Sequence, residues 1–546
     1  ARALLALGDL RLDEGRLAEA EPLLQKALEE SRAVVLPEVE WRALESLGRL
    51  LRRRGEDAAA LDAFEKGIEV VERLRGMVKT EEFRSGFLTN KMDLYEDTVA
   101  LLLDMDRPEE AFTYSERSRA RKFIDILAQQ AFELGSDRER ELYARQQELS
   151  RQMRAVREAL AREEDAGRRS EVTARLQELQ RRYSDLLVDI RVANPALSSF
   201  VTVEVPGPRD LAQVLPDDVS LVVYYAMKDE LAIWVWRQGR LAVRRVAVSR
   251  DELAQRIKTY RLMVQNREML DDVQEFSKGL DGVLVGPVRD LIEGSRAVGI
   301  VPHRGLHYLS FASLYDGEAF LVERYPLFYS PSASLLGHFL RGEPPSAKAE
   351  LQVLAIGNPR VGSPAYELPF TEREVVSVER DFVNVTALTG EKATEEWVKQ
   401  NISRFDVVHF GAHGHFDPVN PLFSSLRLAP QQDDGILHLH EVMGLEIGAT
   451  LVTLSACQSG LGDLRSADEL VSLSRAFTYA GTRSILSTLW RVDDVSTALV
   501  TKHFYRHYVD HGAAESLRHA QLQVMNDGRH YHPTYWGGVI LTGDYR

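Results

Sequence analysis

Residues 451–460, LVTLSACQSG, contain the only cysteine of this 546-residue chain, Cys457. An apolar run that is typical of a β-strand leads into the cysteine, and small polar residues follow it. Residues 405–416, FDVVHFGAHGHF, have the same layout, with an apolar run that ends at His413 and Gly414. If the two strands are neighbours in one sheet, the imidazole and the thiol meet at one edge of that sheet.

An imidazole paired with a thiol indicates a nucleophilic site. A thiol with an ordinary pKa is mostly protonated at neutral pH, and a nearby histidine can take its proton to give the reactive thiolate. The backbone N–H groups of Gly414 and Cys457 are predicted to bind the substrate oxygen as an oxyanion hole. A single cysteine is more often a small buried apolar residue, and a single histidine is more often structural, so the prediction rests on the pair.

The second part of the chain alternates strand patterns with helix patterns. From Val201 onward, apolar runs such as SLVVYYAM, LAIWVW, LQVLAIGNP and ATLVTLSAC are typical of buried strands. Helical patterns such as TEEWVKQNIS separate many of these runs. The alternation predicts an α/β domain with a mostly parallel sheet flanked by helices, and its functional groups should lie at the carboxyl ends of the strands.

The first part of the chain is helical and contains an internal repeat. Small residues recur at an offset of 40: Gly8, Gly15, Ala20 and Ala27 correspond to Gly48, Gly55, Ala60 and Gly67. Small residues let the two helices of a hairpin approach closely, and the pattern resembles tetratricopeptide repeats with a period longer than the usual length of about 34 residues. A third unit is predicted around Ala111, and a generic bundle of helical hairpins is the alternative.

Residues 136–190 are almost all charged or long-chain. Leu142, Leu149, Met153 and Val156 recur at helical spacing, and Gly167 lies near the middle of the segment. We expect two long helices that fold back at this glycine and whose charged side chains face solvent.

Composition limits the class of protein. The net charge of −15 disfavours nucleic acid as the main partner, because phosphate binding needs concentrated lysine and arginine. A single cysteine excludes an internal disulfide framework and fits a cytoplasmic protein. No apolar window is long enough to span a membrane, and the first residues do not have the layout of a signal peptide. The chain does not begin with methionine, which is compatible with a fragment of a longer protein.

No cofactor or metal ion is predicted. His503, His507 and His511 lie four residues apart on one face of a predicted helix, a spacing that can hold zinc. The HExxH pattern is absent and no further ligand is evident nearby, so a packed or hydrated row of histidines is the preferred interpretation.

Several segments together resemble the CHAT family, which consists of caspase-like cysteine peptidases commonly fused to tetratricopeptide repeats. The resemblance rests on VVHFGAHGHF followed by LVTLSACQSGLGD, includes SRAFTYAGTRSILSTLWRVDDVSTALV and HPTYWGGVILTGD, and covers about residues 220–544. It implies the fold of the caspase–separase clan, with His413 as the catalytic histidine and Cys457 as the nucleophile. His409 is then interpreted as a packing or hydrogen-bonding residue.

The resemblance and the sequence patterns divide the chain into four expected parts. Residues 1–130 form the helical repeats, and residues 131–198 form the charged helical hairpin that connects them to the rest. Residues 199–345 form a degraded caspase-like half that extends the sheet, and residues 346–546 form the catalytic half.

Two departures from the family pattern concern the substrate pocket. Residues 466–472, SADELVS, stand where many relatives have a Gly-Glu-Gly element. Ser455 stands two residues before the nucleophile, where similar metacaspases carry an acid that receives a basic substrate side chain. A pocket without a buried carboxylate should favour an uncharged residue before the cut, unless Asp463, Asp493 or Asp494 replaces the acid.

Two classes of function follow from these expectations. A regulated cysteine endopeptidase would cut a protein substrate with His413 and Cys457, while the repeats bind an activator, an inhibitor or the substrate. A catalytically silent scaffold would use the same fold only to bind proteins. The intact pair of His413 and Cys457 favours the endopeptidase, and a metal hydrolase that uses the C-terminal histidines is a distant third.

Overall fold

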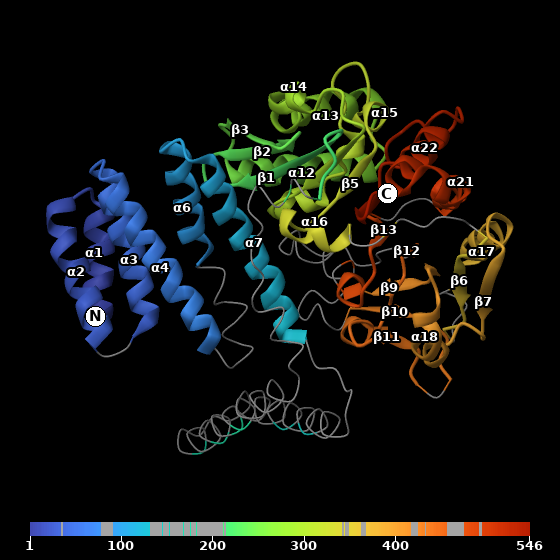
Figure 1. Cartoon of the computed structure of the whole chain (residues 1–546), viewed down its shortest axis with the longest axis horizontal. Helices are drawn as coiled ribbons and strands as arrows, with labels where there is room; N and C mark the ends of the chain where they lie inside the picture. The colour runs from blue at the N-terminus through green and yellow to red at the C-terminus, as the bar shows by residue number, and fades with distance from the viewer. Residues whose placement is uncertain are drawn as a thin grey trace. The chain divides into compact units, whose positions relative to one another are not determined.

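The structure is a computed structural model of the chain, which folds into two units, Ala1–Val205 and Pro206–Arg546 (Figure 1). It describes residues 1–33, 36–77, 91–130, 214–340, 349–361, 367–415, 424–431, 433–455, 476–490 and 494–546, together with a few isolated positions. The predicted charged hairpin, residues 131–198, lies almost entirely outside the described residues. Among the described residues, no helix combines the length and the apolar character needed to cross a bilayer.

The described part of the first unit consists of helical hairpins (Figure 1). The helices are α1 (Arg2–Asp13), α2 (Leu17–Ala33), α3 (Pro37–Arg53), α4 (Asp57–Met77), α6 (Met92–Asp104) and α7 (Pro108–Gln130). Each helix packs against the next along the chain, so that α1 with α2, α3 with α4 and α6 with α7 form three hairpins.

The repeated small residues explain the hairpins. A Cβ atom at Gly8 of α1 would lie 2.6 Å from Cδ2 of Leu24 on α2, and a Cβ atom at Gly48 of α3 would collide with the ring of Phe64 on α4. Gly15 lies in the turn of the first hairpin with a φ of 74°, a conformation that favours glycine. The prediction of close-packed helical repeats is therefore confirmed, and the third hairpin carries Ala111 fully buried.

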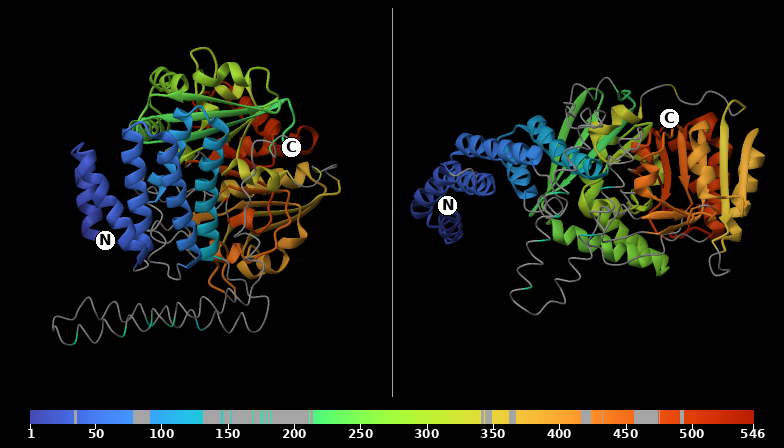
Figure 2. Two further views of the ribbon diagram at one scale, coloured as in Figure 1. Left: turned by 60° about the vertical axis from the view of Figure 1, so that its left-hand side comes forward. Right: turned by 90° about the horizontal axis from the view of Figure 1, so that it is seen from below.

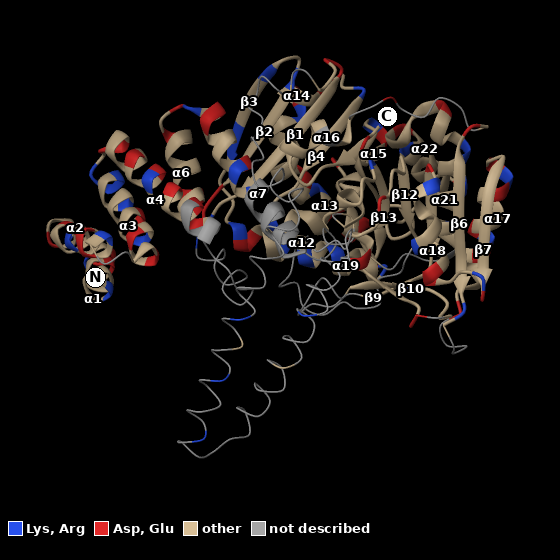
Figure 3. Cartoon of the chain, turned by 60° about the horizontal axis from the view of Figure 1, so that its bottom comes forward, with Lys and Arg blue, Asp and Glu red and all other residues tan. Residues whose placement is uncertain are grey.

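Acidic and basic side chains are interspersed over these helices (Figure 3). Several pairs join different helices, such as Arg49 of α3 with Asp97 of α6 at 2.5 Å. Glu45 of α3 is only 7% exposed, and this burial raises its pKa to about 7, although Arg49 lies 3.0 Å away. A neutral carboxyl is thus favoured inside the helical unit at mildly acidic pH.

The second unit is built on an 11-stranded sheet, in the order β3-β2-β1-β4-β5-β14-β13-β12-β8-β6-β7 among the described residues (Figure 2). The strands are β1 (Val219–Ala226), β2 (Leu231–Arg237), β3 (Arg240–Val246), β4 (Ala297–Val301), β5 (Leu327–Tyr329), β6 (Gln352–Pro359), β7 (Asn384–Gly390), β8 (Val407–Gly411), β12 (Leu451–Leu454), β13 (Ser484–Thr488) and β14 (Val539–Gly543). Most neighbours run parallel, and β1–β2, β2–β3 and β13–β14 run antiparallel. The predicted mostly parallel sheet is confirmed.

Helices flank this sheet (Figures 1 and 2). They are α12 (Arg250–Gln265), α13 (Leu270–Leu284), α14 (Arg289–Ile292), α15 (Leu321–Arg324), α16 (Ala333–Phe339), α17 (Pro369–Asp381), α18 (Glu395–Asn401), α19 (Leu439–Val442), α21 (Asp494–His511) and α22 (Ala513–Met525). Helix α17 packs against β6, β8 and α21, whereas α12 packs against α13. Helix α17 therefore lies beside the strand that precedes His413, whereas α12 and α13 form a separate helix pair.

The sheet joins two parts of the chain edge to edge. Strands β1 to β5 form one side, and β14 connects them to the other side by pairing with β5 at Thr542 and Tyr329. The expectation that the part before residue 346 extends the sheet is confirmed. A separate three-stranded sheet consists of β9 (His413–His415), β10 (Ser425–Arg427) and β11 (Ile436–His438).

Candidate active site

The two strands that precede His413 and Cys457 are neighbours in the sheet. β8 and β12 pair in parallel, with Val407 opposite Leu451 and Phe410 opposite Leu454. The expected adjacency of the two strands is therefore confirmed. Cys457 follows the end of β12 by three positions and lies outside the described residues. The predicted contact between its sulfur and the His413 imidazole stays a prediction.

His413 begins the small sheet directly after β8 ends. The chain turns at the buried Ala412, and His413 then pairs with Arg427 of β10, while Gly414 pairs with Leu426. His413 is half-buried, and His415, two residues further, is exposed. His413 thus lies in the small sheet, directly after the carboxyl end of the large-sheet strand β8. The oxyanion role of Gly414 stays a prediction.

Two glycines bring α17 close to the strands that lead to the site. A Cβ atom at Gly411 of β8 would lie 2.6 Å from Cβ of Thr371, and one at Gly357 of β6 would lie 2.7 Å from Cγ2 of Val375. Any larger residue would push the helix outward. Because the helix lies so close, its next inward residue, Glu374, reaches β8 and the end of β12.

Glu374 connects the two strands through hydrogen bonds. Its Oε2 lies 3.0 Å from Nε2 of His409 on β8, and its Oε1 accepts a hydrogen bond from Oγ of Ser455 at 3.0 Å. The side chains of Glu374 and His409 are 3% and 0% exposed. A buried carboxylate requires such partners, because an unpaired charge in the interior is costly. The interpretation of His409 as a hydrogen-bonding residue is confirmed.

The network continues from His409 to helix α21. The Tyr505 hydroxyl donates to Oγ1 of Thr453 at 2.7 Å and lies 3.2 Å from Nδ1 of His409. The buried His409 ring therefore has a polar partner at each of its two nitrogens, Glu374 at Nε2 and Tyr505 at Nδ1. Burial raises the pKa of Tyr505 well above its usual range, so it stays a neutral hydroxyl. The result is a buried hydrogen-bond network that joins α17, β8, α21 and β12.

Ser455 lies beside a carboxylate that the sequence does not reveal. Its hydroxyl donates a hydrogen bond to the buried Glu374 carboxylate, and the expectation that the pocket has no acid for a basic substrate side chain stays a prediction. The other pocket candidates are not placed: Asp463 and Asp493 lie outside the described residues, and Asp494 begins α21 with its side chain undescribed. Their roles stay predictions.

The histidines of α21 lie beside a further histidine, His519 of α22, which their spacing in the sequence does not reveal. His507 lies beside His511, with ring centroids 5.4 Å apart, and beside His519 of α22 at 4.2 Å. Burial, followed by the charges of Lys502 and Arg506, lowers the pKa of His503. Within the described part of the chain, no group of three or more histidine, cysteine, aspartate or glutamate residues has the arrangement to hold a metal ion.

Glu374 and Tyr505 are the residues of this region that sequence reasoning missed. Each lies in an ordinary helical pattern, 35 and 96 residues from His409. The available signal was the pair of glycines, Gly357 and Gly411, each at the end of an apolar strand, which indicates a close approach by another backbone. That signal does not identify which helix approaches.

Comparisons with solved structures give distant matches. A chain of the Saccharomyces cerevisiae separase–securin complex matches with a TM-score of 0.44 and 10% identity, covering 99% of this chain and 49% of that chain. The Arg-specific cysteine proteinase gingipain R matches with a TM-score of 0.31 and 9% identity, covering 54% of this chain and 74% of that chain.

Two curated proteins are similar in sequence. Tetratricopeptide repeat protein 28 of Mus musculus is 26% identical and that of Homo sapiens is 24% identical, and each match covers 49% of this chain. Only 13% of the length of each relative is covered. A tetratricopeptide-repeat family model matches residues 1–73, and the CHAT-domain family model matches residues 274–544. The chain is therefore a CHAT-domain protein that carries tetratricopeptide repeats.

Proposed function

We propose that this chain is a regulated cysteine endopeptidase that cleaves a protein substrate with His413 and Cys457. The observation that carries the proposal is the parallel pairing of β8 with β12, because it makes both residues follow the same edge of the sheet. The match of the CHAT family model over both segments supports it. The hydrogen-bond network of Glu374 and His409 supports it further, because Glu374 also accepts a hydrogen bond from Ser455, two residues before the cysteine.

The proposed chemistry needs only groups of this chain and one water molecule. The His413 imidazole takes the proton of the Cys457 thiol, and the thiolate attacks the carbonyl carbon of the scissile peptide bond. The N–H groups of Gly414 and Cys457 stabilise the negative oxygen. The imidazolium then protonates the leaving amine. A water molecule, deprotonated by His413, hydrolyses the thioester and restores the free thiol.

The helical repeats have a separate role in this proposal. Tetratricopeptide repeats suggest contacts with other proteins, and we propose that they bind an activator, an inhibitor or the substrate. The single cysteine would stay reduced in the cytoplasm, where we propose that the protein works.

A scaffold without catalytic activity is the second candidate. The curated relatives are named for their repeats and not for an activity, which favours this alternative. In a scaffold, Cys457 would be an ordinary thiol with no need for His413. The two candidates therefore differ in the reactivity of one side chain.

Alkylation of Cys457 separates the two candidates without knowledge of the substrate. Since the chain has one cysteine, intact-mass analysis of iodoacetamide labelling reports Cys457 alone. An activated thiol should react quickly at pH 6 to 7 and slowly in His413→Ala, because an ordinary thiol has a pKa near 8.5. His415→Ala is the matched control, since this exposed histidine lies on the same strand. Equal rates in all three proteins would leave the scaffold as the function.

A further inference from the structure

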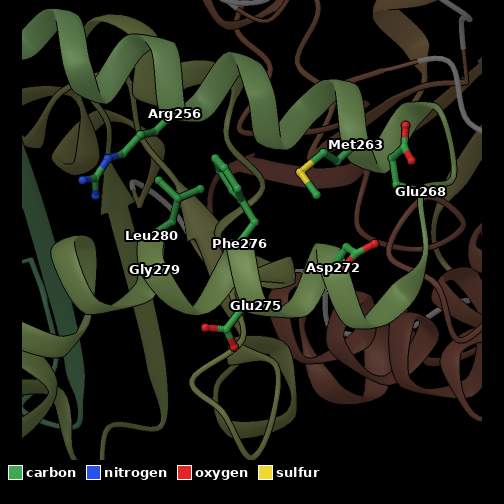
Figure 4. Close-up of a pocket in the computed structure, with 8 residues that line it drawn as sticks. All are labelled: Arg256, Met263, Glu268, Asp272, Glu275, Phe276, Gly279 and Leu280. Carbon is green, nitrogen blue, oxygen red and sulfur yellow. The ribbon is translucent and has the colours of Figure 1, made fainter.

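A groove of about 690 Å³ lies between α12 and α13, outside the candidate active site (Figure 4). Its apolar lining comes from Met263 of α12 and from Phe276 and Leu280 of α13. Figure 4 shows these side chains between the two helices, with Glu268 and Asp272 at the end where the helices are joined. Leu280 is buried, whereas Met263 and Phe276 are only partly covered.

The charges around the groove are mostly negative and lack ion-pair partners. Glu268, Asp272 and Glu275 line the groove and are exposed. Within the described part of the chain, none of these three carboxylates has an ion-pair partner. The one cation of the lining, Arg256, is already paired with Glu252 at 2.6 Å. An apolar centre with unpaired carboxylates fits a partner that offers apolar side chains flanked by lysine or arginine.

Gly279 leaves room for the backbone of a partner beside the groove. It lies inside α13 and lines the groove, and a Cβ atom there would meet nothing within 4 Å. A glycine inside a helix costs about 1 kcal/mol relative to alanine, and here no contact within the fold requires it. The missing side chain permits close approach of another backbone, because small residues let helices pack at short distance.

We propose that the groove between α12 and α13 is a docking site for a basic amphipathic α-helix of a partner protein. The incoming helix would place leucine-like side chains on Met263 and Phe276 and its lysine or arginine side chains beside Glu268 and Asp272. Its backbone would pass over Gly279. This is the helix-in-groove mode of recognition, in which residues at spacings of three and four anchor the ligand. The proposal is independent of the activity of Cys457.

The test uses the full chain and a defined probe. The probe is a fluorescein-labelled peptide of about 18 leucines and lysines whose leucines form one helical stripe. A peptide with the same composition but dispersed leucines is the probe control. Fluorescence anisotropy should show that the first peptide binds at least about tenfold more tightly than the second. Equal binding of the two peptides, or no binding, would overturn the proposal.

Matched variants assign the binding to the groove. Asp272→Lys should weaken binding of the peptide about tenfold or more. Asp271→Lys is the control, because Asp271 lies in the same first turn of α13 but does not line the groove, and this variant should bind as the wild type does. Gly279→Leu should abolish binding of the peptide. Gly282→Leu should preserve it, because Gly282 does not line the groove and a Cβ atom there would also meet nothing within 4 Å. Circular dichroism should show that both leucine variants fold, since leucine favours helix more than glycine.

Two results would contradict the assignment. Equal effects of Asp271→Lys and Asp272→Lys would show nonspecific attraction to the acidic chain. Sedimentation could instead detect a dimer of this chain. If Gly279→Leu dissociates that dimer, a second copy of the chain and not a basic helix occupies the groove.

Discussion

The Ser455 hydroxyl donates a hydrogen bond to the Glu374 carboxylate across 3.0 Å, and this contact links the end of β12 to helix α17. The other carboxylate oxygen lies 3.0 Å from Nε2 of His409, so the charge of Glu374 is fully engaged inside the protein. The end of β12 at Ser455 is therefore held by a buried hydrogen-bond network as well as by apolar packing.

Loss of the Glu374 carboxylate should destabilise the sheet unit. Glu374→Ala leaves the buried His409 ring and the Ser455 hydroxyl without their acceptor, and each buried polar group left unsatisfied costs about 1–3 kcal/mol. Urea unfolding of the sheet unit, followed by tryptophan fluorescence, measures the change. Glu379→Ala, at an exposed position on the same helix, should stay within about 0.5 kcal/mol of the wild type. Equal effects of the two variants would show that the network contributes nothing to stability.

The proposed dyad predicts non-additive effects on catalysis. Cys457→Ala and His413→Ala should each reduce proteolysis about a thousandfold or more, and the double variant should lose no more than the single ones, because the two residues act as one unit. A cleavage profile on a denatured protein library compares the three variants with the wild type. His415→Ala should keep full activity. Proteolysis that persists in Cys457→Ala would exclude this residue as the nucleophile.

Two helical glycines should respond to alanine in opposite ways. Gly48→Ala forces a Cβ atom into the Phe64 ring and should destabilise the repeats by about 1–3 kcal/mol. Gly282→Ala meets nothing within 4 Å and should stabilise α13 by up to about 1 kcal/mol. Amide hydrogen exchange in α3 and in α13 measures each effect locally. Stabilisation by Gly48→Ala would contradict the described packing of α3 on α4.

The buried Glu45 should make the helical repeats less stable as pH rises. Burial raises its folded-state pKa to about 7, above the usual 4.5, so the folded state binds more protons than the unfolded state between these values. The contribution of Glu45 to the free energy of unfolding is therefore fully present below pH 4.5. Roughly 3 kcal/mol of this contribution is lost as pH rises through 7. Hydrogen exchange of α3 between pH 5 and 8, corrected for intrinsic rates, should show the loss.

Two glutamine variants test whether Glu45 is responsible. Glu45→Gln should remove the pH dependence, because glutamine does not titrate, and Glu56→Gln, an exposed position, should retain it. A slope that survives in Glu45→Gln would assign the dependence to other groups.

The sequence predicts the elements of this fold better than the contacts between them. The offset between Gly8 and Gly48 predicts the hairpins because helix packing depends on local spacing, and the apolar runs before His413 and Cys457 predict neighbouring strands. The Glu374–Ser455 contact could not be predicted, because it joins positions 81 residues apart and depends on how closely α17 approaches the sheet. His519 was missed for the same reason: α22 folds back on α21 and brings its ring beside His507.

The hydrogen bond between Ser455 and Glu374 also predicts how substrate preference can be changed. Both oxygens of Glu374 are engaged and its side chain is 3% exposed, so it is not available to a basic substrate side chain. We therefore expect the wild type to favour an uncharged residue before the cut. An acid at position 455, which the resemblance to metacaspases leads one to expect, would face the Glu374 carboxylate. Two like charges about 4 Å apart repel by about 4 kcal/mol at an effective dielectric constant of 20.

Ser455→Asp alone should thus destabilise the sheet unit without creating a basic preference, because one of the two carboxyls would hold a proton. Ser455→Asp combined with Glu374→Gln removes the repulsion, since the glutamine amide can donate to the new carboxylate. The double variant should recover stability relative to Ser455→Asp and should shift the cleavage profile toward arginine or lysine. Urea unfolding and a cleavage profile of the wild type, Ser455→Asp, Glu374→Gln and the double variant measure both effects. A wild-type profile already dominated by arginine, and unchanged in the double variant, would place the pocket acid at Asp463, Asp493 or Asp494 instead.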